Sequence, residues 1–271
     1  MSSRPYRNPF RSGLKAAMLG AALAEAAASF AMRRPRFNGK TLSARERANW
    51  LQDAACAALK RIGMEVVAEG DPPLHGLVVS NHLSYLDVLA YASILPCVFV
   101  AKRQVREWPV FGTFATMAGT IYVDRERRAG NGGAVTQMEE ALAAGVPVML
   151  FPEGTSSDGA QVLRFHSRFF EPAMRTHAAV TAAAIGYASS TAGEARLAYH
   201  GADVFAPHLV RTLGQRQLEA RVVFAAGGKR YGDRKEAARA TQAEVELLRS
   251  VFAGRSATQP ATDPFRLTRA G

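Results

Sequence analysis

The stretch that decides the fold lies in residues 76–94, which read GLVVSNHLSYLDVLAYASI. Its first part, residues 77–80, is a short apolar run of the kind that forms a strand buried on both faces of a sheet. A polar turn follows at Asn81 and His82, and the apolar segment from Ser84 onward is long enough for a helix. A buried strand followed by a helix predicts an α/β fold, in which sites are usually built at the carboxyl ends of strands.

The same alternation of strands and helices extends in both directions from this stretch. We expect strands at residues 65–68, 76–80, 98–101, 120–123, 147–151, 180–185 and 218–225. We expect helices at residues 84–94, 132–144, 169–176 and 234–252. Because several strands are apolar on both faces, the sequence predicts a mostly parallel central sheet flanked by helices. This α/β domain is expected to cover residues 63–254 and to be followed by a flexible polar tail at 255–271.

Two amphipathic helices are predicted ahead of this domain. The first, at residues 14–32, is dominated by alanine and carries one apolar face with 4-3-4 spacing, formed by Leu19, Leu23, Ala26 and Phe30. The second, at residues 43–61, begins with a capping-box pattern of Ser43 and Glu46. Its apolar face has the same spacing and consists of Leu51, Ala55, Ala58 and Ile62. We interpret residues 1–62 as a basic, two-helix, membrane-binding region.

Three other interpretations of this region stay open. A membrane-spanning helix needs roughly 20 strongly apolar residues, and an alanine-rich segment interrupted by Glu25 fits a helix in the membrane interface better. A signal peptide is a second alternative, given the basic residues before the apolar segment. In the third, both helices cover the enzyme core and touch no lipid.

The charge of the chain is concentrated near its beginning. The chain has 34 basic and 23 acidic residues, a net charge of +11 and a pI of about 10.2. Residues 1–50 hold ten Lys or Arg and two Glu, so they carry +8 of that excess. A basic patch indicates an anionic partner, unless it is only a soluble basic tail. Because the aromatic–basic interleaving of RNA-binding modules is missing, we expect anionic membrane lipids and no nucleic acid as partners.

His82 and Asp87 are the first candidate catalytic pair. A histidine can take a proton from a hydroxyl near neutral pH, and a carboxylate can fix its tautomer. On one continuous helix the two side chains would lie about 140° apart, so the pair requires a turn at His82 with the helix starting afterwards, at Ser84. The alternative is that Asp87 serves only the helix N-terminus.

Two further polar groups follow predicted strands. The segment 119–125 reads GTIYVDR and ends in Arg125, which suits phosphate binding, and Lys102 follows a neighbouring strand. The segment 151–157 reads FPEGTSS. There Gly154 permits a tight turn, and Glu153 and Thr155 offer hydrogen bonds to phosphate or hydroxyl groups. A solvated charge run and an ordinary turn are the alternatives for these two segments.

These three blocks, in this order, resemble the glycerolipid acyltransferase family typified by bacterial lysophosphatidic acid acyltransferases. The family's Asn-His-x4-Asp block is present at 81–87, its Gly-x-x-x-(Ile/Val)-Asp-Arg block at 119–125, and its Phe-Pro-Glu-Gly-Thr-Arg-Ser block at 151–157. The similarity covers roughly residues 64–230. The resemblance implies that His82 is the general base with Asp87 as its partner. It also implies that the second and third blocks bind the acceptor, through Arg125, Glu153, Gly154 and Thr155.

The resemblance further implies the reaction and its setting. A fatty acyl chain would pass from acyl-CoA or acyl carrier protein to a lysophospholipid hydroxyl, first of all that of 1-acyl-glycerol-3-phosphate, in phospholipid biosynthesis. No metal, nucleotide or flavin cofactor is required. The enzyme would sit at the inner (cytoplasmic) membrane as a peripheral or monotopic protein, with its active site facing the cytoplasm.

Two departures from the family pattern concern the acceptor. Ser156 stands where the third block has Arg, and the apolar strand 180–185 lacks the family's proline. A lyso-ornithine lipid or another lysolipid is therefore the alternative acceptor.

Other classes of protein fit the sequence less well. A serine hydrolase lacks its Gly-x-Ser-x-Gly elbow here, and no zinc-hydrolase ligand pattern appears. A noncatalytic polybasic membrane adaptor remains the rival from another class.

Overall fold

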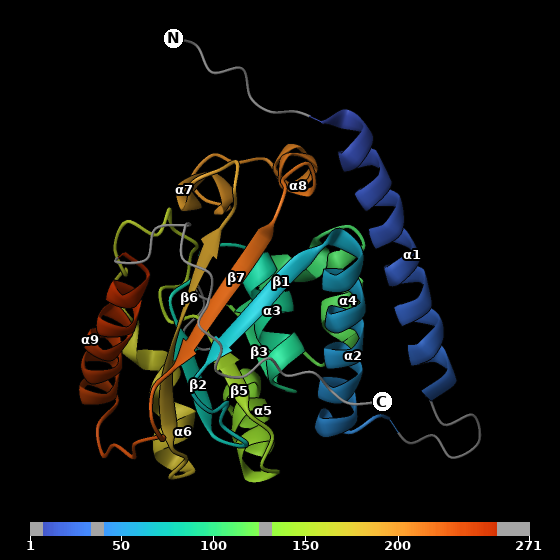
Figure 1. Ribbon diagram of the computed structural model, residues 1–271. Helices are drawn as coiled ribbons and strands as arrows, with labels where there is room; N and C mark the ends of the chain where they lie inside the picture. Colours follow the sequence, from blue (N-terminus) through green and yellow to red (C-terminus); the bar gives the residue numbers. More distant parts are fainter. Residues whose placement is uncertain (1–7, 34–40, 125–131, 254–271) are drawn as a thin grey trace.

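The computed structural model describes residues 8–33, 41–124 and 132–253. The predicted tail at 255–271 and the predicted acceptor-binding Arg125 lie outside the described residues. A seven-stranded sheet forms the centre of the molecule, and helices cover both of its faces (Figure 1).

All seven predicted strands are present in this sheet. They are β1 (Met64–Glu69), β2 (Leu77–Ser80), β3 (Val98–Lys102), β4 (Ile121–Val123), β5 (Val148–Leu150), β6 (Val180–Ala188) and β7 (Leu218–Phe224). They lie in the order β1-β7-β6-β2-β5-β3-β4, and every neighbouring pair is parallel except β6 and β7. The prediction of a mostly parallel α/β sheet is confirmed.

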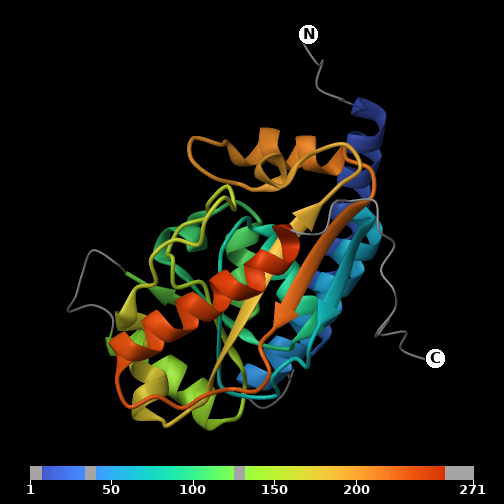
Figure 2. The same ribbon diagram turned by 60° about the vertical axis from the view of Figure 1, so that its left-hand side comes forward.

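Two layers of helices enclose the sheet. One face carries α1 (Pro9–Arg33), α2 (Ala44–Ile62), α3 (Leu86–Ile94) and α4 (Phe111–Met117), and the other carries α5 (Gly132–Ala143), α6 (Glu171–Arg175) and α9 (Arg234–Ala253) (Figures 1 and 2). The pleat divides the side chains of each strand between the two layers. Val78 of β2 packs in the first layer, whereas its neighbours Leu77 and Val79 pack in the second.

The N-terminal helices share a core with the α/β domain. The predicted capping box is confirmed, since Ser43 N–H donates to Glu46 Oε2 at 2.7 Å and Glu46 N–H donates to Ser43 Oγ at 3.3 Å. Trp50 of α2 is fully buried and donates from Nε1 to the Ala26 carbonyl of α1 at 3.0 Å. By length and composition α1 is apolar enough to cross a membrane, yet its predicted apolar face packs against α2 and the domain.

The structure differs from the expected helices at several positions. The helix α4 was not predicted. Residues 189–217, between β6 and β7, contain two short helices that were not predicted, α7 (Glu194–Leu197) and α8 (Phe205–Leu213). In addition, α3 begins at Leu86 and not at Ser84, because Tyr85 occupies the cap position. Ser84 lies two residues before the first helical residue, and its Oγ still accepts a hydrogen bond from Leu86 N–H at 3.4 Å.

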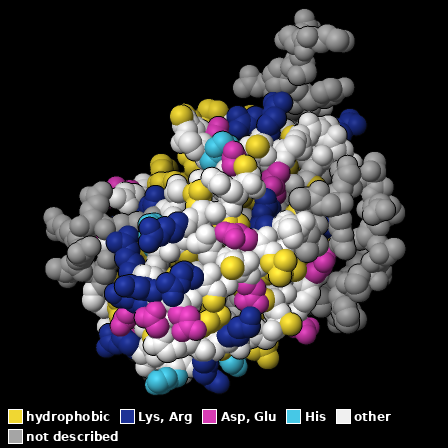
Figure 3. Space-filling model, turned by 90° about the vertical axis from the view of Figure 1, so that its left-hand side faces the viewer, with side chains coloured by type: hydrophobic (Ala, Val, Ile, Leu, Met, Phe, Trp, Pro, Cys, Tyr) yellow, Lys and Arg dark blue, Asp and Glu magenta, His cyan; other side chains and the backbone are white. Residues whose placement is uncertain are grey.

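Charges of both signs cover the side of the molecule that carries α9. Lys and Arg side chains lie among Asp and Glu there, and apolar side chains gather toward the upper end (Figure 3). Typical pairs are Lys229 with Glu244 at 3.0 Å and Arg234 with Glu171 at 3.1 Å. This mixed face contrasts with the basic first fifth of the chain.

Candidate active site

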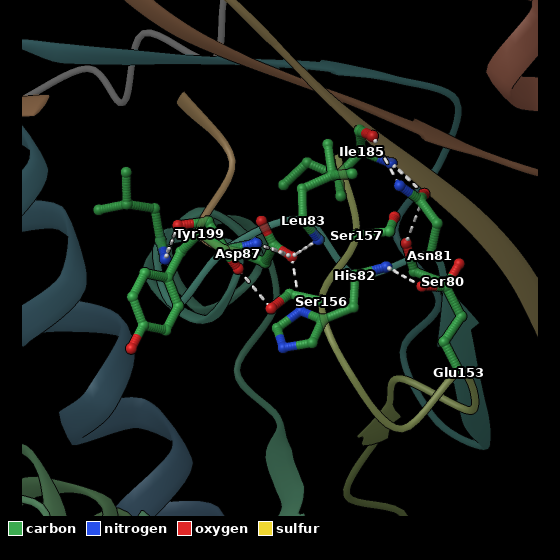
Figure 4. A network of polar contacts seen from close by, with 12 residues as sticks. Ser80, Asn81, His82, Leu83, Asp87, Glu153, Ser156, Ser157, Ile185 and Tyr199 are labelled. Carbon is green, nitrogen blue, oxygen red and sulfur yellow. Dashed lines mark hydrogen bonds and ion pairs between the residues drawn. The ribbon is translucent and has the colours of Figure 1, made fainter. Parts of the chain in front are cut away.

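Asn81 fixes the turn that carries His82. Its buried side chain donates from Nδ2 to the Ile185 carbonyl at 3.0 Å and accepts from Ile185 N–H at 2.9 Å (Figure 4). These two bonds join the end of β2 to the middle of β6. His82 therefore leaves the sheet from a rigid anchor at the carboxyl end of a central strand.

The side chains of His82 and Asp87 meet directly, as the sequence predicts. His82 Nδ1 lies 2.7 Å from Asp87 Oδ2, and the Asp87 side chain is fully buried. The His82 side chain keeps 22% of its surface exposed, and its ring stacks on Phe151 of the third block at 4.3 Å between ring centroids. The buried carboxylate and the stacked ring together hold the imidazole in one orientation, with its Nε2 side available for chemistry.

Asp87 is held by donors from three directions besides the histidine. Its Oδ2 accepts from Leu83 N–H at 2.7 Å and Ser84 N–H at 3.1 Å, and its Oδ1 accepts from the Tyr187 hydroxyl. A carboxylate is acceptor-only, so Nδ1 of His82 carries the proton and donates. Asp87 thus orients the histidine and also satisfies backbone N–H groups at the start of α3, which the sequence had left as alternatives.

Tyr187 is a site residue that the sequence did not point to. It lies in the buried strand β6, among apolar and small residues where an aromatic side chain is expected in any core. Burial and the neighbouring Asp87 raise the pKa of its hydroxyl well above the usual value, so it remains protonated and can donate. Only the pairing of β6 with β2 brings it to Asp87.

Glu153 ties the third block to the first. Its side chain is 4% exposed, and its two oxygens accept from His82 N–H at 3.3 Å and from Leu163 N–H at 3.1 Å. Burial raises the pKa of Glu153 to about 8, although the two backbone donors oppose the shift. Ser157 N–H also donates to the His82 carbonyl at 2.9 Å. In this arrangement Glu153 orients backbone, and its predicted contact with the acceptor stays a prediction.

The remaining predicted acceptor residues lie at the same edge of the sheet. Gly154 follows β5 with a φ of +76°, a left-handed conformation that favours glycine, and Thr155 next to it is exposed. Lys102 ends β3, which pairs with β5. The structure therefore brings the Lys102 and Gly154 ends of two neighbouring parallel strands to the edge that carries His82, while their binding roles stay predictions.

Ser156, the departure from the family pattern, is engaged within the protein. Its hydroxyl donates to the Tyr199 carbonyl, and Tyr199 N–H donates to the Leu83 carbonyl at 2.8 Å. Arg164 and Arg168, the next two arginines along the chain, are both exposed, and Arg168 lies over the ring of Phe169 at 4.8 Å. Ser156 thus connects the third block to the segment between β6 and β7.

No cluster of three or more His, Cys, Asp or Glu side chains suited to a metal ion occurs among the described residues.

A family model described as Acyltransferase matches residues 63–186, a range that holds the His82, Asp87 and Glu153 contacts described above.

Relatives and a solved structure agree with this match. The chain is 31% identical over 201 residues to a lyso-ornithine lipid O-acyltransferase of Pseudomonas aeruginosa, covering 73% of this chain and 76% of that protein. It is 35% identical over 177 residues to a 1-acyl-sn-glycerol-3-phosphate acyltransferase of Neisseria gonorrhoeae, covering 64% of this chain and 68% of that one.

The crystal structure of the 1-acyl-sn-glycerophosphate acyltransferase PlsC from Thermotoga maritima shares the fold. Its TM-score is 0.66 at 18% identity, with 92% of this chain and 98% of that chain covered. Together with the identity to curated relatives, these findings show that the chain belongs to the acyltransferase family, as an enzyme of the glycerolipid acyltransferase type.

Proposed function

We propose that this chain transfers a fatty acyl group from a thioester to the hydroxyl of a lysolipid, with His82 as general base. The observation that carries the proposal is the 2.7 Å contact between His82 Nδ1 and a fully buried Asp87, beside a partly exposed imidazole. A histidine oriented in this way can accept a proton on Nε2 while the carboxylate stabilises the imidazolium.

The reaction needs one proton transfer in each direction. His82 Nε2 takes the proton of the acceptor hydroxyl as its oxygen attacks the thioester carbonyl carbon. The tetrahedral intermediate then breaks its carbon–sulfur bond, and the imidazolium returns the proton to the departing thiolate. Acyl-CoA and acyl carrier protein both supply such a thioester. Three other donors hold the Asp87 side chain in place beside the imidazolium.

Two acceptors fit this chemistry. The 1-acyl-glycerol-3-phosphate acceptor is supported by the presence of the three blocks in the family's order and by the Neisseria relative. A lyso-ornithine lipid is the second candidate, favoured by Ser156. The hydroxyl of Ser156 is engaged with Tyr199 where the family pattern has a cation for phosphate, and ornithine carries no phosphate. The Pseudomonas relative bears that activity in its name.

The same proposal includes the cellular setting. The enzyme attaches to the cytoplasmic face of the inner membrane through its N-terminal two-helix region, with anionic lipids as partners. The exposed outer stripe of α1, including Phe10 at 81% and Leu14 at 53% exposure, supports attachment in the interface.

The test is a transfer assay with purified protein in detergent. Radiolabelled acyl-CoA and acyl carrier protein are offered with lysophosphatidic acid, lyso-ornithine lipid and other lysophospholipids. We expect acylation of one acceptor, reduced by about 10²-fold or more in His82→Ala, as is usual for a missing general base. His75→Ala, an exposed histidine outside the site, is the matched control. Equal transfer by His82→Ala and wild type would rule out the mechanism.

A further inference from the structure

A cavity outside the active site gathers cations from three segments of the chain. It is open to solvent, has a volume of about 550 Å³ and lies between α1, the end of α2 and the residues ahead of β7. Its cationic lining residues are Arg11, Lys15, Arg61 and Arg216. Among the described residues that line it, none has an acidic side chain. Four positive groups around one cavity are an arrangement that favours an anionic ligand.

The contacts of these cations leave much of their hydrogen-bonding capacity unused. Arg11 Nη1 and Lys15 Nζ each reach only a backbone carbonyl, those of Gly214 and Gln215, at 3.3 Å. Arg61 pairs through Nη2 with Glu25 at 2.5 Å, but its buried Nη1 has no hydrogen-bond partner among the described residues. Burial, and then the charge of Arg11, lower the pKa of Lys15. An anion in the cavity would offset both effects on Lys15.

Apolar side chains lie directly beside this basic cluster. Leu14 and Met18 line the same cavity at 53% and 38% exposure, and Phe10 lies one turn earlier at 81%. Residues 10, 14 and 18 follow i, i+4 spacing on α1, so they form one stripe next to Arg11 and Lys15. Cations beside an exposed apolar stripe are typical of a helix in the headgroup region of a bilayer.

The cavity and the active site open at the same end of the molecule. Residues 215–217 precede β7, whose first residues pair with the carboxyl end of β6, Glu219 with Ala188. Strand β6 runs parallel to β2, whose carboxyl end carries His82. Val210 of α8 is also exposed at this end, at 46%, and its carbonyl accepts from Ser12 of α1 at 3.0 Å. A bilayer that contacts the cavity would therefore face the catalytic end.

We propose that this cavity binds the phosphate of an anionic phospholipid in the bilayer, with Arg11, Lys15, Arg61 and Arg216 around the headgroup and Leu14 and Met18 toward the acyl chains. The site differs from the acceptor site at the third block, because none of its residues belongs to the three blocks. The inference rests on the proposed membrane attachment and is independent of the proposed His82 chemistry.

The test compares binding to phosphatidylcholine vesicles with and without phosphatidylglycerol. We expect the wild type to prefer phosphatidylglycerol, and Lys15→Gln/Arg216→Gln to lose about tenfold or more of that affinity, since a cation near the surface contributes about fivefold. The matched control is Lys60→Gln/Arg196→Gln, which removes two exposed charges at the same end but outside the cavity. We expect it to lose clearly less than the cavity variant, because its two side chains contact no bound headgroup. Equal losses of vesicle affinity by the two variants would show that only the net charge of the protein matters, and would overturn the proposal.

Further measurements distinguish a lipid site from a site for soluble phosphate, and separate both from the proposed His82 chemistry. Arg216→Gln alone changes an exposed side chain and should lose about fivefold, which keeps the test valid if the double variant does not fold. Excess soluble glycerol phosphate should leave the vesicle preference intact, and its abolition would assign the cavity to a soluble phosphate. His82→Ala should bind the vesicles like wild type. A wild-type protein that transfers acyl groups normally but shows no preference for phosphatidylglycerol would overturn the lipid site alone.

Discussion

Asp87 shows at the scale of single residues how one carboxylate can orient a histidine and satisfy the start of a helix together. The fully buried carboxylate accepts from His82 and Tyr187 side chains and from two backbone N–H groups. Hydrogen bonds to the ionised form offset the desolvation that burial imposes on a carboxylate. Removal of one donor should therefore disturb the histidine as well as the fold.

Tyr187→Phe is the change that tests this arrangement. Loss of a hydrogen bond to a charged group usually costs about 1.5–3 kcal/mol, so we expect lower stability and a turnover number reduced about tenfold with little change in KM. Steady-state kinetics and urea unfolding measure both. The control is Tyr91→Phe, which removes a buried hydroxyl bonded to Ser80 at 2.7 Å. It should lower stability while leaving turnover close to that of wild type, and parallel loss of turnover in both variants would assign Tyr187 a structural role only.

Glu153 gives the stability of the enzyme a defined pH dependence. Below its ordinary pKa of 4.5 the group is protonated in the folded and the unfolded chain, so its burial carries no charge penalty. Between 4.5 and about 8 the unfolded chain ionises while the folded chain holds the proton, so this stability is lost as the pH rises.

The change that isolates this effect is Glu153→Gln, which does not titrate. We expect the difference in unfolding free energy, wild type minus variant, to fall with rising pH through that window, by at most about 1.4 kcal/mol per pH unit. Urea unfolding at a series of pH values measures it. A difference that is flat or that grows with pH would show that the two backbone donors, and not burial, set the pKa of Glu153.

At the scale of elements, Arg249 joins four segments around the site. From α9 its guanidinium donates to the carbonyls of Ile185 in β6 and Gly159 in the loop after β5, at 2.9 and 2.8 Å. It also forms a bidentate pair with Glu194 of α7, whose Oε1 accepts from Tyr187 N–H at 2.8 Å. The helix α9 thus holds the third block and the strand of Tyr187 in place.

Arg249→Met should destabilise the enzyme by about 2 kcal/mol, below the full cost of breaking a buried pair because both side chains keep some exposure. Arg234→Met on the same helix breaks a far more exposed pair with Glu171 and should cost less than about 1 kcal/mol. Denaturant unfolding compares the two, and Arg249→Met/Glu194→Met should recover part of the loss because it leaves no unpaired carboxylate. Equal effects of the two single variants would contradict the tie between α9 and the loop.

At the scale of the whole molecule, α1 has two faces with different tasks. Ala22, Ala26 and Phe30 are buried against the enzyme, whereas the stripe at residues 10, 14 and 18 is exposed beside the cationic cavity. These helices can therefore cover the enzyme core and contact the membrane at the same time. The vesicle-binding prediction belongs to this scale, because it depends on charges that α1, α2 and the residues before β7 contribute together.

The sequence by itself determined all seven strands, most of the helices and the contact between His82 and Asp87. Buried strands and amphipathic helices each have a characteristic spacing of apolar residues along the sequence. His82 and Asp87 lie only five positions apart, so local helix geometry alone required a turn between them. The three sequence blocks, in their order, also indicated the resemblance to the glycerolipid acyltransferase family.

Only the tertiary structure decided the contacts between residues far apart in the chain. Tyr187 reaches Asp87 across 100 positions through the pairing of β6 with β2, and Arg249 reaches Glu194 through the packing of α9. The helices α4, α7 and α8 were not predicted because they are short, and helices of such length depend on tertiary packing for their stability. The four cations that line the cavity are spread over some two hundred residues of the sequence. Strand pairing and helix packing bring them together, and no local sequence pattern links them.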